Sequence, residues 1–91
     1  MYYVYILYSP TKDKYYIGYT GQLTDRFQRH QQGRSKSTKA GRPWLIAYLE
    51  RFDDPTGAYR RESYIKKQKS RKYVQALVDS YHANPFPLPS Q

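Results

Sequence analysis

Two strand-forming runs separated by a short polar segment open the chain, and they constrain its fold more than any other feature. Residues 2–8 (YYVYILY) and 14–20 (KYYIGYT) are rich in tyrosine, valine and isoleucine, which favour β-strands. Residues 9–13 (SPTKD) have the composition of a tight turn. The pattern therefore predicts an antiparallel hairpin.

The alternation of side chains along a strand sorts the hairpin residues by face. On the first strand, Tyr3, Tyr5 and Leu7 are expected on one face. On the second strand, Tyr16 and Gly18 share a face. The hairpin thus presents tyrosine side chains at defined positions of a sheet.

The residues after the hairpin predict an amphipathic helix with an unusual stripe. Thr20 can cap this helix, which runs to about Gln32 and ends at Gly33 as the C′ residue. The stripe at helical spacing consists of Leu23, Arg26, Phe27 and His30. Two of these four are polar where a structural helix prefers leucine or valine, and such mismatches occur at functional sites.

The middle of the chain predicts a loop, a strand and a second helix. Residues 33–43 form a basic Gly/Ser loop that we expect to be exposed and mobile. Residues 44–52 predict a third strand. Asp54 and Pro55 are suited to the N-cap and first positions of a helix running to about Lys69.

The second and third predicted helices differ in their stripes. The second carries Ala58, Glu62 and Ile65 on one face, so that an acid interrupts the apolar residues. Ser70 can cap the third helix. Its apolar stripe, which we assign to the core, consists of Val74, Leu77, Val78 and Tyr81.

The predicted element order is β-β-α-β-α-α, which indicates an α+β domain with a three-stranded, mainly antiparallel sheet flanked by helices. We expect one domain over residues 1–82. Residues 83–91 are proline-rich and predict an extended, weakly ordered tail.

The charge of the chain predicts a polyanionic partner. Sixteen Lys and Arg against seven Asp and Glu give a net charge of +9. Many of the cations gather in two clusters, which consist of Arg34, Lys36, Lys39 and Arg42, and of Arg60, Arg61, Lys66, Lys67, Lys69, Arg71 and Lys72. This pattern favours nucleic acid, with anionic lipid or an acidic protein as the alternatives.

Other parts of the composition exclude several classes of protein. The chain has no cysteine, which excludes disulfides and thiolate metal sites and is consistent with a cytoplasmic location. No apolar run approaches the roughly 20 residues that span a bilayer, so we expect no membrane segment.

The spacing of five side chains resembles the GIY-YIG nuclease superfamily. Residues 3–5 (YVY) occupy the place of its first signature triplet, and residues 16–18 (YIG) match the second. Arg26 follows the start of the second triplet by ten residues, and His30 follows Arg26 by four, as in the family pattern. Glu62 matches the metal-binding glutamate of the family. The resemblance covers residues 2 to about 78 and is closest to the small stand-alone branch.

The resemblance implies a metal-assisted hydrolysis of phosphodiester bonds. Glu62 would hold a single Mg²⁺ or Mn²⁺, which takes its other ligands from water and the substrate phosphate. Arg26 offers a fork of donors to the phosphate. Either Tyr5 or His30 would deprotonate the attacking water, and Tyr16 would orient the phosphate or the water. We expect these five side chains to converge on one surface.

Each of these residues also has a structural interpretation. The two tyrosines suit a core. Arg26 and His30 are spaced as neighbours one turn apart on a helix, and Glu62 is spaced to neutralise Lys66. The chain also departs from the family pattern, because the first triplet lacks glycine and residues 68–75 contain no asparagine.

Three functions remain open at this point. The leading one is an endonuclease that contacts DNA through its backbone and shape, with little sequence preference. Branched or damaged DNA, which several relatives process, is a possible substrate by analogy. The second is a non-catalytic nucleic-acid-binding module that retains the fold, and the third is an RNA-associated protein.

In the fold, Gly18 is expected to permit a close approach to its strand.

Overall fold

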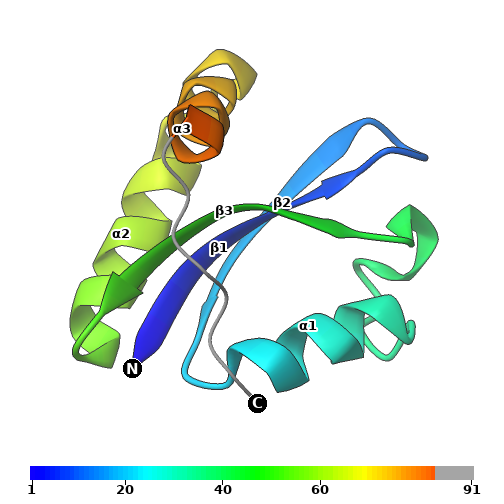
Figure 1. The fold of residues 1–91 in the computed structure, drawn as a ribbon, viewed down its shortest axis with the longest axis horizontal. Coiled ribbons are helices and arrows are strands. Elements are labelled where there is room, and N and C mark those ends of the chain that lie inside the picture. Colours follow the sequence, from blue (N-terminus) through cyan, green and yellow to red (C-terminus); the bar gives the residue numbers. More distant parts are fainter. Residues whose placement is uncertain (84–91) are drawn as a thin grey trace.

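A computed structural model describes residues 1–83 of the chain (Figure 1). Strands β1 (Tyr2–Ser9) and β2 (Lys14–Thr20) form the predicted hairpin, and β3 (Leu45–Phe52) pairs with the other side of β1. The sheet order is β2-β1-β3, and both pairings are antiparallel. The predicted fold class and element order are therefore confirmed, whereas the tail that we predicted lies, apart from Ala83, outside the described residues.

Helices cover both faces of the sheet (Figure 1). Helix α1 (Leu23–Gln31) lies on one face. Helices α2 (Pro55–Lys67) and α3 (Arg71–Ala83) lie together on the other. The central strand β1 is consequently covered on both sides.

Two separate apolar clusters correspond to these two layers. Val4 and Ile6 of β1 pack with the apolar residues of α2 and α3. Tyr3, Tyr5 and Leu7, the alternate residues of the same strand, pack with α1 and with the residues that precede β3. The predicted division of the strand into two faces is confirmed, since successive side chains point to opposite sides.

The start of α1 differs from the prediction. Thr20 is not the helix cap but the last residue of β2, and it is buried. Its hydroxyl accepts a hydrogen bond from the backbone N–H of Gln22 at 2.9 Å, and Gln22 occupies the N-cap position without a side-chain cap. Thr20 thus stabilises the turn that leads into the helix, because a threonine oxygen can bond the backbone two residues on. At the other end Gly33 has φ 73, as a C′ glycine should.

The loop of residues 33–43 is less exposed than we predicted. It contains the short 3₁₀ helix Lys39–Gly41, and Thr38 and Gly41 are buried. The Trp44 indole donates a hydrogen bond to the Thr38 carbonyl at 2.8 Å. The Gln31 side-chain amide donates to the backbone carbonyl of Trp44 and accepts from its backbone N–H. The Lys and Arg side chains of this loop are therefore exposed, while part of its backbone is packed against the rest of the domain. The mobility of the loop stays a prediction.

The caps of α2 and α3 agree with the sequence. The Asp54 carboxylate accepts from the backbone N–H of Gly57 at 2.8 Å, and Pro55 follows it as the first helical residue. Helix α2 ends at Lys67, slightly before the predicted end, and Lys69 at the junction has φ 47. The Ser70 hydroxyl then accepts from the N–H of Tyr73 at 3.1 Å.

The predicted stripe of α3 packs on the sheet. Val74 and Val78 are buried in the cluster under α2 and α3, and Leu77 packs against it. Tyr81, at the end of the stripe, packs against the other cluster. Within residues 1–83, no helix combines the length and the apolar character required to cross a bilayer.

Candidate active site

The site is built around Tyr5 at the middle of the central strand. Its side chain is 2% exposed, and its backbone pairs with Gly18 on β2. A Cβ atom on Gly18 would lie 2.5 Å from the Tyr5 hydroxyl and 2.6 Å from its Cζ atom. The tyrosine ring therefore lies across β2, an edge strand, and the close approach that the sequence assigns to Gly18 is made by this ring.

Gly18→Ala is expected to displace the Tyr5 ring and to destabilise the fold. The ring is buried and has little room to move, so the added methyl group should cost about 1–3 kcal/mol, as overpacking does. Urea unfolding measures this loss, and Gly57→Ala, whose Cβ would be 3.1 Å from the nearest atom, is the matched control. An unfolding free energy for Gly18→Ala equal to that of the wild type would contradict the packing described here.

Three side chains form a buried series of hydrogen bonds. The Tyr5 hydroxyl is 3.1 Å from Nε2 of His30, and Nδ1 of His30 is 2.7 Å from Oγ1 of Thr38. The Thr38 hydroxyl donates to the Ser35 carbonyl at 3.3 Å, so its oxygen accepts from Nδ1–H of the histidine. In a neutral ring Nε2 then carries no proton. The series therefore orients a histidine lone pair toward the tyrosine hydroxyl.

The protonation states of this series follow from burial. Burial lowers the pKa of His30, and the charges of Arg26 and Arg29 lower it further. Burial raises the pKa of Tyr5 to about 12, and the nearby Tyr16 contributes in the same direction. Near neutral pH, His30 is thus a neutral acceptor and Tyr5 a protonated donor. Near neutral pH, His30 can therefore accept a proton, whereas the protonated hydroxyl of Tyr5 cannot do so unless it passes its own proton on.

Arg26 opposes the effect of burial at the tyrosine. It lies on α1 one turn before His30, and its side chain is half-buried. A hydrogen-bonding interaction with the Tyr5 hydroxyl, together with the charge of the guanidinium, lowers the pKa of Tyr5. Arg26 and His30, the two polar residues on the otherwise apolar stripe of α1, therefore both face Tyr5.

Aromatic contacts surround the series. The Tyr16 ring lies with its edge toward His30, at a centroid distance of 5.1 Å, and 6.4 Å from the Tyr5 ring. Its other neighbour is Trp44, at 6.3 Å. Such contacts fix ring positions without using the polar atoms. Tyr16 is partly exposed, so it forms the boundary between the buried series and solvent.

Glu62 reaches this region from a different layer. It lies on α2, on the opposite side of the sheet from α1, and its side chain is 13% exposed. Its negative charge nevertheless raises the pKa of Tyr5, because the tyrosine ring extends across the edge strand that α2 also contacts. Four of the five predicted side chains thus gather on one face of the sheet. The expectation that all five converge on one surface is not met by Glu62, because α2 packs on the other face and its carboxylate approaches across β2.

A divalent ion would have one protein carboxylate at this position. Within residues 1–83 there is no group of three His, Cys, Asp or Glu side chains that could hold a metal. The Glu62 carboxylate lies 3.3 Å from the Lys66 ammonium, which is the pairing that the structural interpretation of Glu62 expects. A single carboxylate still fits Mg²⁺, which retains waters and takes oxygens from a phosphate.

The predicted cationic residues differ in their availability. All are exposed except Arg61, which is half-buried. The Arg61 guanidinium donates to Glu50 at 2.9 Å, and the Tyr48 hydroxyl donates to the same carboxylate oxygen at 2.8 Å. Burial and this carboxylate raise the pKa of Tyr48 to about 12. Arg61 therefore joins α2 to β3, whereas the other cations are exposed, although Arg71 also bonds Asp13 and Lys66 pairs with Glu62.

Thr38 is the member of the site that the sequence identified least well. The position of a threonine within a basic loop gave no reason to expect its hydroxyl beside His30. A buried histidine requires a partner for each ring nitrogen, and this requirement is the signal that could have directed attention to a nearby hydroxyl. The two cavities described below include none of the five predicted side chains.

Comparison with known proteins gives a consistent match. The model of the GIY-YIG catalytic domain matches residues 1–74. A "UPF0213 protein" of Syntrophus aciditrophicus is 36% identical over 77 residues, which cover 82% of this chain and 87% of the relative. A "UPF0213 protein" of Limosilactobacillus reuteri is 33% identical over 81 residues, which cover 86% and 83%. No solved structure gives a significant match.

Proposed function

Because the chain belongs to the family of GIY-YIG catalytic domains, we propose that it is a metal-dependent endonuclease that hydrolyses phosphodiester bonds in DNA. The domain indicates a nuclease-type function and a nucleic-acid substrate. The observation that carries the proposal for this chain is the buried series Thr38–His30–Tyr5, with Arg26 beside the tyrosine hydroxyl.

The proposed reaction uses Tyr5 and His30 together. As a water attacks phosphorus, Tyr5 takes a proton from the water and passes its own proton to Nε2 of His30. A new P–O bond forms, the bond to the leaving sugar oxygen breaks, and that oxygen takes a proton from solvent. Thr38 accepts from Nδ1–H and so supports the positive charge that develops on the histidine. The two candidates for the base, which the sequence left open, thus act in series.

Other side chains would bind and orient the phosphate. Arg26 would neutralise charge on its oxygens with its fork of donors. Tyr16, at the boundary with solvent, would orient the phosphate or the water through its hydroxyl. Glu62 would hold Mg²⁺ or Mn²⁺, and the bound ion would stabilise charge on the phosphoryl group.

Binding to DNA is expected to depend strongly on salt. If about five of the exposed cations contact phosphates, a plot of log K against log salt should have a slope near −4 to −5 on duplex DNA. Fluorescence anisotropy across a series of NaCl concentrations measures this slope. A slope near zero, or no binding at low salt, would exclude nucleic acid as the partner.

A non-catalytic binding module is the second candidate. Two observations favour it. The Glu62 carboxylate is paired with Lys66, and the raised pKa of Tyr5 keeps its hydroxyl protonated near neutral pH. The two candidates separate when linear, nicked, flapped and branched DNAs and an RNA are incubated with the protein, with and without Mg²⁺ or Mn²⁺. Metal-dependent cleavage supports the endonuclease, and binding without cleavage of any substrate supports the module.

A further inference from the structure

A basic hollow lies on the face of the sheet opposite Tyr5 and His30, where β2 meets the junction of α2 and α3. We call it the junction hollow. It has a volume of about 340 Å³, and its polar lining consists of Lys14, Lys66, Lys69, Ser70 and Arg71. Ile17 and Val74 contribute to its apolar lining. None of the described residues that line it is acidic, and four of them are cations. Two of the four pair with carboxylates outside the lining, Lys66 with Glu62 and Arg71 with Asp13.

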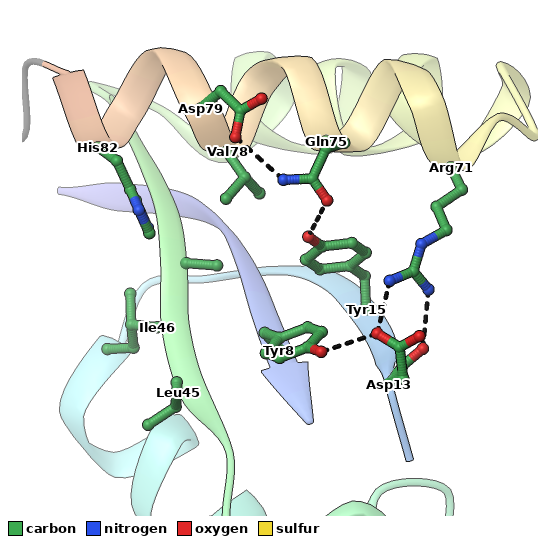
Figure 2. Close-up of a pocket in the computed structure, with 11 residues that line it drawn as sticks. Tyr8, Asp13, Tyr15, Leu45, Ile46, Arg71, Gln75, Val78, Asp79 and His82 are labelled. Atoms are coloured by element: carbon green, nitrogen blue, oxygen red, sulfur yellow. Dashed lines mark hydrogen bonds and ion pairs between the residues drawn. The ribbon is translucent and has the colours of Figure 1, made fainter. Parts of the chain in front are cut away.

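The neighbouring hollow has a different character, which makes the basic one distinctive. This second hollow, of about 440 Å³, includes two acids, Asp13 and Asp79, in its lining (Figure 2). Tyr15 and Arg71 line both hollows and form the wall between them. In a chain of net charge +9, only one of these two adjacent hollows suits an anion.

The fold holds one cation of the junction hollow, Arg71, in place. Arg71 donates to the backbone carbonyl and the carboxylate of Asp13, both at 2.7 Å, and its guanidinium lies 5.0 Å from the centre of the Tyr15 ring (Figure 2). A guanidinium has five N–H donors, so these two bonds leave others for a ligand. Lys69 has a left-handed backbone, which is uncommon for lysine and directs the chain sharply from α2 into α3.

The hollow lies one helical turn from the candidate metal ligand. Lys66 lines it and is four residues after Glu62 on α2, an advance of about 6 Å along the helix. Successive phosphates on one strand of DNA advance about 3.4 Å along the duplex axis. A phosphate in the hollow would therefore lie within a few nucleotides of one held at Glu62.

We propose that the junction hollow binds a phosphate group of the nucleic acid close to the reacting bond, and so fixes the direction of the strand across the edge of the sheet. The position relative to the reacting bond rests on the proposed function, but the phosphate site itself does not. The group is either an internal phosphodiester or a terminal phosphate at a strand end. Both offer the same oxygens to lysine and arginine.

The first test uses inorganic phosphate and the amide resonances of the ¹⁵N-labelled protein at constant ionic strength. We expect saturable shifts at Lys14, Ser70 and Arg71. They should be lost in the double variant Lys14→Gln/Lys69→Asn, since asparagine tolerates the left-handed backbone. The control Lys12→Gln/Arg51→Gln also removes two exposed charges and should keep them. Shifts that do not saturate, or that persist in the first double variant, overturn the proposal.

The second test uses DNA and identifies the source of the phosphate. The slope of log K against log salt should decrease in magnitude by about 1 in Lys14→Gln/Lys69→Asn, relative to the control pair. If the ligand is a terminal phosphate, a nick with a 5′-phosphate binds more tightly than one with a 5′-hydroxyl, and only in the wild type. If it is an internal phosphodiester, both nicks weaken equally in the variant. An unchanged slope with both nicks overturns the proposal.

These tests remain informative if the proposed function fails. The inorganic phosphate titration should still saturate in a Glu62→Ala variant, which is not expected to cut DNA. Saturation should come at the same or a lower phosphate concentration, because the substitution releases Lys66 from its ion pair. A wild type that cuts no DNA but binds phosphate in the hollow would contradict the endonuclease and leave the junction hollow as a phosphate site.

Discussion

Glu62→Ala is expected to lower metal-dependent cleavage by at least about 10³-fold, which corresponds to about 4 kcal/mol of transition-state stabilisation. In the proposed site Glu62 is the one protein ligand of the metal. Its loss would remove the ion that stabilises charge on the phosphoryl group. Single-turnover cleavage with Mg²⁺ or Mn²⁺ measures the effect.

The fold should tolerate this substitution. Alanine favours helices more than glutamate does, and the pair with Lys66 contributes about 0.3–0.5 kcal/mol at most. DNA affinity without metal should stay level or rise slightly, because a negative charge leaves a positive surface. Asp53→Ala, which removes an exposed acid before α2, is the control and should cut normally. A Glu62→Ala variant that cuts as fast as the wild type would defeat the assignment of the metal ligand.

Tyr5→Phe is expected to lower cleavage by about 10²- to 10⁴-fold, the range for loss of general base catalysis. His30→Gln should have a similar effect, and the double variant should be little slower than either single one, because the two residues act as a unit. Additive losses would show that Tyr5 and His30 act independently.

The pH dependence separates this series from a structural role. His30 must be neutral to accept a proton, and burial holds its pKa below the ordinary value. Cleavage should therefore remain at its plateau near pH 7 and fall as the pH decreases through the lowered pKa of His30. This acidic limb should be absent from the residual activity of His30→Gln.

Tyr5→Phe should also cost about 1–3 kcal/mol of stability, because it leaves Nε2 of a buried histidine without a partner.

The sequence predicted the sheet and its helices because those depend on local patterns. Residues 2–8 and 14–20 have both strand composition and a turn between them, and Asp54 with Pro55 is a strong start for a helix. Thr20 was assigned wrongly for a physical reason. A threonine oxygen can bond the same type of N–H group at a helix cap and in a turn, and only the backbone path distinguishes the two.

The site was less accessible to prediction because its contacts are not local. Spacing brought Arg26 and His30 to the same face of a helix, but it did not indicate that Thr38 would orient the histidine. The ring of Tyr5 lies over Gly18 because of strand pairing, and the resulting burial raises the pKa of the tyrosine in a way that charge composition does not reveal. Arg61 was grouped with the DNA-binding cations, although its contact with Glu50 depends on how α2 packs on β3.

The central position of β1 has an evolutionary consequence. Val4 and Ile6 are buried in one layer, and Tyr3, Tyr5 and Leu7 are buried in the other. Substitution at any of these five consecutive positions would therefore disturb a packed side chain. Selection for folding acts on one side of the strand, and in the proposed site selection for chemistry would act on the other, at Tyr5. Sequence divergence among descendants of such a protein should therefore accumulate on the outer surfaces of the helices, while this strand changes slowly.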